Sequence, residues 1–177
     1  MCALATVARQ AAEGEALARQ LSPSPDFNQE LLELDRVSRR ASRAWASASR
    51  DPEDLYVDAA ALNVHGYYAG LERIFTLVAE RVDGSLPSGP NWHQDLLRQM
   101  TAEIPGVRAA VLSPDLYSLL DRYRGFRHVV RNVYAYVLDP RLVAVLVEDL
   151  PEASERLRVQ LAAFADALEA IAEAADD

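Results

Sequence analysis

The sequence predicts an all-α protein, an up-and-down bundle of five to six helices. Pro and Gly fall mostly between periodic segments rather than inside them, which is typical of helix boundaries. No segment alternates apolar and polar residues with period two, as a half-buried strand would. The long segments are joined by short connections, and this favours antiparallel neighbours.

The helix boundaries follow from caps and prolines. Asp51, Ser113 and Asp139 each precede a Pro, which combines a good N-cap residue with Pro at the first helical position. Asn91 is expected to cap a short fourth helix, and Pro151 is expected to kink or split the last one. The predicted helices cover residues 3–21, 26–49, 52–82, 91–104, 113–138 and 139 to the C-terminal end.

Composition narrows the class of protein. Half of the 177 residues are hydrophobic and a quarter are charged, which predicts one soluble globular domain over residues 1–177. All 18 basic residues are Arg, and the formal net charge of −9 argues against a uniformly basic nucleic-acid binder while allowing a local basic groove. The absence of Lys fits either a GC-rich coding sequence or a need for guanidinium forks that grip phosphate.

Location is predicted from cysteine usage and hydropathy. Cys2 is the single cysteine, so an internal disulfide and a thiolate metal site are excluded and a reducing cytoplasm is the expected compartment. The N-terminal residues lack the pattern of a secretory signal, and no apolar run is long enough to cross a bilayer. We therefore expect a cytoplasmic protein without a membrane partner.

The predicted helix 113–138 has two opposed faces. At 100° per residue, one arc is apolar and consists of Tyr123, Phe126, Val129, Val130, Val133 and Val137. The opposite arc is polar and consists of Arg124, Arg127, His128, Arg131, Asn132 and Tyr134. Its three guanidinium groups, Arg124, Arg127 and Arg131, are called the Arg stripe below.

Two interpretations of the Arg stripe remain open. Acids such as Asp121, Glu72 or those of the acidic C-terminal segment could pair with it and make it a structural contact surface. Alternatively, the stripe binds an anion or an RNA phosphate, because clustered charges often mark functional sites.

The residues of this helix resemble a known family. Its spacing is similar to a motif of HEPN-domain ribonucleases of the HepT type, in which Arg is followed by four residues, then His, one further residue and Tyr. Here Arg127 and Tyr134 stand at the Arg and Tyr positions, and Asn132 stands at the His position. The segments 70–75, 88–93 and 124–128 resemble the same family, and the resemblance covers about residues 50–150.

This resemblance implies a HEPN-like homodimer, the RNA-cleaving toxin of a bacterial toxin-antitoxin pair. Its expected partner is a minimal nucleotidyltransferase antitoxin, which in some pairs attaches AMP to the motif Tyr, here Tyr134. Cleavage without metal or cofactor needs a base for the 2′-hydroxyl proton and a cation for the phosphate. Arg127 matches the cation, and Arg124, His128, Arg131 and Glu72 are the expected binding or supporting residues.

Asn132 departs from the family motif. An amide cannot act as a general base near neutral pH, although it can position a ribose or phosphate oxygen. Activity is therefore weakened or lost, or a neighbour substitutes. His128 lies one turn earlier on the same face, and the spacing from Arg122 fits a looser motif, but that register puts Val130 at the Tyr position. We favour a binding role for His128.

Other residues have alternative interpretations. Glu72 either orients an Arg of the stripe or is a surface charge beside Arg73, and we favour the second. His65 and His93 have no histidine or cysteine partner at helical spacing, so we expect no metal site. Gly66 and Gly70 are expected to permit close helix packing.

The functional alternative to an active toxin is a non-catalytic module. In that case a dimeric helical bundle would use the Arg stripe to bind a nucleotidyltransferase partner or a nucleotide. The third and simplest hypothesis is a structural helical bundle that binds no ligand.

Overall fold

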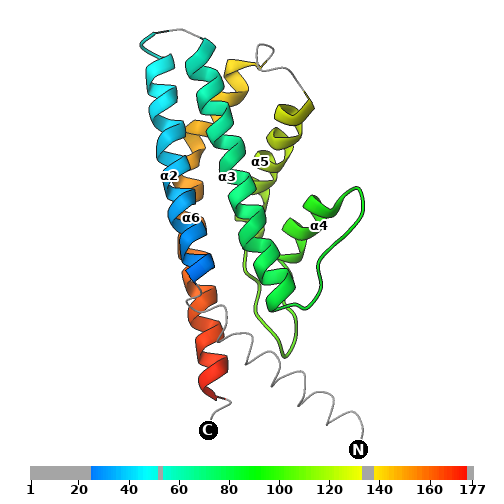
Figure 1. Cartoon of the computed structure of the whole chain (residues 1–177). Helices are drawn as coiled ribbons and strands as arrows, with labels where there is room; N and C mark the ends of the chain where they lie inside the picture. Colours follow the sequence, from blue (N-terminus) through cyan, green and yellow to red (C-terminus); the bar gives the residue numbers. More distant parts are fainter. Residues whose placement is uncertain (1–24, 52–53, 133–137, 175–177) are drawn as a thin grey trace, which may run out of the picture.

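The computed structural model describes residues 25–51, 54–132 and 138–174, and these residues form an all-α bundle (Figure 1). The described helices are α2 (Pro25–Ala48), α3 (Asp54–Arg81), α4 (Trp92–Gln99), α5 (Pro114–Asn132) and α6 (Pro140–Ala174). In this part of the chain an isolated bridge between Ile104 and Arg108 is the extent of β-structure. The predicted fold class is confirmed, and the predicted helix 3–21 lies outside the described residues.

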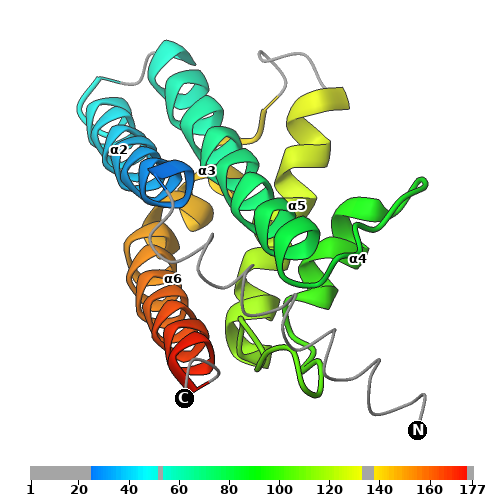
Figure 2. The same cartoon turned by 60° about the horizontal axis from the view of Figure 1, so that its bottom comes forward.

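Helix α3 lies at the centre of the bundle. It contacts each of the other four described helices, with α2 and α6 on one side of it and α4 and α5 on the other (Figure 2). The sequence of α3 suits this position because apolar residues occur around most of its circumference. Its buried residues are Ala60, Ala61, Val64, Tyr67, Tyr68, Gly70, Leu71, Glu72, Ile74, Phe75, Val78 and Ala79.

The predicted role of glycine in helix packing holds at one of two positions. A Cβ atom built on Gly70 would lie 2.7 Å from Cδ2 of Leu34, a buried residue of α2. A Cβ atom on Gly66 would have nothing within 4 Å. Close packing of α2 on α3 therefore depends on Gly70, and the prediction for Gly66 was wrong because that position faces open space.

We expect Gly66→Ala to be more stable than Gly70→Ala, although both gain about 1 kcal/mol of helix propensity. Gly66→Ala keeps this gain. In Gly70→Ala the new methyl must displace the Leu34 side chain, at a cost of about 1–3 kcal/mol. Urea unfolding of the two variants measures the difference, and equal free energies of unfolding would contradict the close approach.

Two of the predicted caps are confirmed by hydrogen bonds. The backbone N–H of Leu116 donates to Oγ of Ser113 at 3.3 Å, at the start of α5. The backbone N–H of Arg141 donates to Oδ1 of Asp139 at 2.9 Å, at the start of α6. Asn91 occupies the predicted N-cap position of α4, but its side chain makes no cap hydrogen bond.

Two other predicted boundaries also differ from the structure. Helix α4 ends at Gln99 rather than near Ile104, because the following residues make a tight turn instead. Gly106 has a φ of 75° in this turn, a conformation that favours glycine. Helix α6 is continuous across Pro151, so the expected split does not occur.

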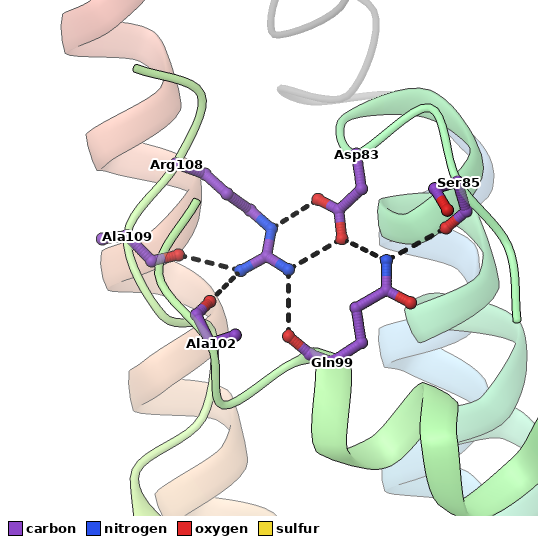
Figure 3. A network of polar contacts seen from close by, with 6 residues as sticks. All are labelled: Asp83, Ser85, Gln99, Ala102, Arg108 and Ala109. Carbon is purple, nitrogen blue, oxygen red and sulfur yellow. Dashed lines mark hydrogen bonds and ion pairs between the residues drawn. The ribbon is translucent and has the colours of Figure 1, made fainter. Parts of the chain in front are cut away.

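A buried arginine fixes α4 to the end of α3 (Figure 3). The Arg108 side chain is fully buried and makes a two-pronged contact with Asp83, with Nη2 donating to Oδ2 at 2.7 Å and Nε donating to Oδ1. Its other donors reach the backbone carbonyls of Gln99, Ala102 and Ala109. All five guanidinium N–H groups are thus used.

Asp83 and Gln99 complete this network, which is called the Arg108 clamp below. Nε2 of Gln99 donates to Oδ2 of Asp83 at 2.6 Å and to the backbone carbonyl of Ser85 at 3.0 Å. Asp83 follows α3 and Gln99 ends α4, so the clamp sets the position of α4 against α3.

None of the described helices combines the length and apolar character that crossing a bilayer requires.

Candidate functional site

Helix α5 presents the two faces that its sequence predicts. Tyr123 and Phe126 are buried in the core, and the Tyr123 hydroxyl donates to the carbonyl of Leu146 on α6 at 2.8 Å. The Tyr123 ring also packs 5.8 Å from that of Tyr67 on α3, measured between ring centroids. Because this face is fixed against α3 and α6, the polar face of α5 has a defined orientation.

Glu72 lies between His93 and Arg127 and joins three helices. Its Oε2 is 3.0 Å from Nε of Arg127 on α5, and its Oε1 is 2.6 Å from Nδ1 of His93 on α4. The side chains of Glu72, Arg127 and His93 are only 9%, 16% and 18% exposed. The favoured interpretation of Glu72 as a surface charge beside Arg73 was therefore wrong, because Glu72 faces into the bundle and contacts the Arg stripe.

The environment disfavours charge on both Glu72 and His93. Burial raises the pKa of Glu72 to about 7, although the three guanidinium groups of the Arg stripe act in the opposite direction. Burial, followed by the positive charges of the same groups, lowers the pKa of His93 to about 4. The pair is thus not an imidazolium–carboxylate ion pair at neutral pH.

One proton must nevertheless lie between these two residues. Two lone pairs 2.6 Å apart would repel, so either Nδ1 or Oε1 carries the proton. Oε1 and Nδ1 are buried, and neither forms a well-directed hydrogen bond with any group in the described part of the chain. The close polar contact of these two buried atoms is therefore with each other.

The other residues of the Arg stripe are less enclosed. Arg124 donates from Nε to Oδ1 of Asp121 at 2.6 Å, one turn earlier in α5, as the acid-pairing interpretation expects. Arg131 and His128 are exposed on α5. Asn132 is the last residue of α5, and Tyr134 lies outside the described residues.

Two further residues of α3 lie near the Arg stripe. Burial, followed by the charges of Arg127 and Arg131, lowers the pKa of His65. Burial, followed by the charge of Glu72, raises the pKa of Tyr68, whose buried hydroxyl has no hydrogen-bond partner among the described residues. Since His65, Tyr68 and Glu72 are spaced by three and four residues, one polar line on α3 faces α5.

Sequence reasoning missed His93 as a neighbour of Arg127. Spacing along the chain gave no signal, because the contact joins residues on α3, α4 and α5. The segment 88–93, which contains His93, was nevertheless one of the segments that resemble the HepT family. In the described part of the chain no group of three His, Cys, Asp or Glu side chains is arranged to hold a metal ion.

Comparison with known proteins gave a match to a family model. A family model described as HepT-like protein matches residues 59–168, a range that contains Glu72, His93 and Arg127. A search of curated proteins and a search of solved structures found no significant match to the chain.

Proposed function

The chain belongs to the HepT-like protein family, and on that premise we propose that it is the toxin of a bacterial toxin-antitoxin pair, a metal-independent endoribonuclease. The observation that carries the proposal is the contact between Glu72 and Arg127 at 3.0 Å. It holds the motif arginine of α5 in a mostly covered position. The contact is made through Nε, and the terminal NH₂ groups of a guanidinium are the donors that grip a phosphate in a fork.

In this proposal Arg127 stabilises the charge that develops on the phosphate during cleavage. A preorganised guanidinium in a partly dehydrated site acts more strongly than one in water. Glu72 positions Arg127, and Arg124 and Arg131 attract the RNA backbone, with His128 as a further binding residue. Asn132 would position a ribose or phosphate oxygen, since its amide cannot take up a proton at neutral pH.

The wider assignment follows from the family. We propose that the single domain acts in the cytoplasm as a homodimer whose partner is a minimal nucleotidyltransferase antitoxin, with Tyr134 as the residue that the partner modifies. No cofactor is proposed, and the charge of Arg127 supplies the stabilisation that a metal would otherwise supply.

We expect Arg127→Ala to lose RNA cleavage by about 10²–10³-fold, because the charge stabilisation of the transition state is removed. Wild type and variant are assayed on a single-stranded oligoribonucleotide with chelator present. Arg122→Ala is the matched control, since Arg122 lies on the same helix but pairs with Asp149 of α6 at 2.7 Å. Cleavage that persists in Arg127→Ala, or that vanishes with chelator alone, would contradict the site.

A second candidate function is supported by Asn132. Because this residue cannot act as the base of the family motif, the chain could be a non-catalytic module that binds a nucleotidyltransferase partner or a nucleotide. A wild-type protein that leaves RNA intact, yet loses binding to the adjacent nucleotidyltransferase on Arg127→Ala, would favour this function.

A further inference from the structure

We propose that His93 is the general base of the site and that Glu72 holds it in the reactive tautomer, an inference that rests on the proposed RNA cleavage. Because Nδ1 of His93 lies 2.6 Å from Oε1 of Glu72, Nε2 is the ring nitrogen left for substrate. The same carboxylate contacts Arg127 through Oε2 at 3.0 Å, so base and cation flank a single group.

This arrangement supplies what Asn132 lacks. A base needs a lone pair, and once Glu72 loses its proton above about pH 7 its carboxylate accepts the Nδ1 proton and leaves the lone pair on Nε2. The same carboxylate stabilises the imidazolium that forms when Nε2 takes up a proton. His128, in contrast, is exposed on α5.

The surroundings of His93 restrict its ring. The ring packs against that of Trp92 at a centroid distance of 3.6 Å, and the imidazole is only 18% exposed. His93 also lies in the first turn of α4, where the helix dipole disfavours a resting imidazolium. The Arg108 clamp holds the other end of the same short helix.

The chemical step balances without a metal or a co-reactant other than water. The 2′-hydroxyl proton passes to Nε2 of His93 while the 2′-oxygen bonds to phosphorus. The bond from phosphorus to the 5′-oxygen breaks, and that oxygen takes a proton from water. The products are a 2′,3′-cyclic phosphate and a 5′-hydroxyl, and His93 returns its proton to solvent. Arg127 stabilises the phosphorane-like charge in between.

His93→Gln tests the base role. Gln keeps a side chain that can hydrogen-bond to Glu72 but cannot take up a proton, so we expect cleavage of the oligoribonucleotide to fall by about 10²–10⁴-fold. His65→Gln is the matched control, because His65 lies near Arg127 and Arg131 without an ion contact to Glu72. We expect its rate to stay within about threefold of wild type. An RNA with 2′-O-methyl groups should resist all the proteins.

Two measurements separate a base from a structural role. Added imidazole should restore cleavage to His93→Ala, with a rate that rises with pH as the free imidazole loses its proton. Above about pH 7, where Glu72 is a carboxylate, nitrogen chemical shifts of the wild-type protein should identify Nε2 as the unprotonated nitrogen of His93, a result that needs no cleavage. Absence of rescue in a folded variant, or a lone pair on Nδ1, would overturn the role of His93.

The outcomes for the two proposals differ. If the wild type cleaves RNA and His93→Gln cleaves equally fast, the base role fails while the proposed function stands. If the wild type leaves RNA intact, the proposed function fails and the base role fails with it. If adding Asn132→His to the His93→Gln variant accelerates cleavage, the base position lies on α5 and not on α4.

Discussion

Replacing Arg108 by Met should lower the free energy of unfolding by about 3–5 kcal/mol, because it leaves the carboxylate of Asp83 buried without its partner. The Asp83 side chain is 1% exposed, so water cannot compensate for the lost contact. The variant also removes the donors to three backbone carbonyls, each of which costs free energy when it is buried and unpaired. Urea unfolding measures the change.

An exposed ion pair on α4 provides the matched control. Arg98 contacts Asp95 at 2.7 Å, as close as the Nη2 contact of Arg108, but its side chain is 70% exposed. We expect Arg98→Met to change the free energy of unfolding by less than about 1 kcal/mol. Equal losses in Arg98→Met and Arg108→Met would show that burial does not set the strength of the Arg108 clamp.

A double-mutant cycle separates the pair from the rest of the clamp. Asp83→Ala should lower the free energy of unfolding far less in the Arg108→Met background than in the wild-type protein, because it removes the carboxylate that Arg108→Met leaves unpaired. Additive effects would indicate that the two side chains do not act together.

Substitutions of Glu72 and His93 should give stabilities with opposite pH dependence. In His93→Gln, burial still raises the pKa of Glu72 from 4.5 to about 7, so the folded state binds more protons than the unfolded state. The free energy of unfolding should therefore fall as pH rises from about 4.5 to 7. In Glu72→Gln, burial still lowers the pKa of His93 from 6.5 to about 4. The free energy of unfolding should then rise as pH rises from about 4 to 6.5.

In the wild-type protein, this pair should leave the free energy of unfolding nearly constant between pH 4.5 and 6.5. The unfolded chain holds one proton there, on His93, and the folded pair also holds one, so the proton count does not change. In each single variant, the free energy of unfolding should change by about 2–3 kcal/mol over the pH range given for that variant.

Urea unfolding across pH 4–8 measures these profiles, and Glu72→Gln/His93→Gln is the baseline for all other groups. The charged and titratable groups that act on the pair remain in every variant, and they are Arg124, Arg127, Arg131 and Tyr68. Slopes of the same sign in both single variants would falsify the assignment of the two pKa shifts.

The helices could be predicted from the sequence because their boundaries depend on local signals. Ser113 and Asp139 cap α5 and α6 through their own side chains, and nothing distant is needed. Asn91 has the right residue type but makes no side-chain cap bond, and α4 is instead held at its far end, where Gln99 joins the Arg108 clamp. Local propensity is therefore the weakest predictor for the shortest helix.

The candidate site could be predicted only in part. Arg127 was found because its position on a polar helix face and its motif spacing are both local properties. The orientation of Glu72 depends on which side of α3 packs against α5, and a helix that is apolar around most of its circumference does not reveal that side. His93 approaches Glu72 across the 83–92 connection, a tertiary contact that no periodicity encodes.

The Arg108 clamp also bears on the order in which the molecule assembles. An isolated helix of eight residues such as α4 is unstable in water, so α4 acquires its structure only when the end of α3 presents Asp83. Hydrogen exchange at the α4 amides would then report the opening of this tether rather than fraying of a helix. Glu72 and Arg127 gain His93 only when α4 has formed, so on the proposed function a newly made chain is inert until that step is complete.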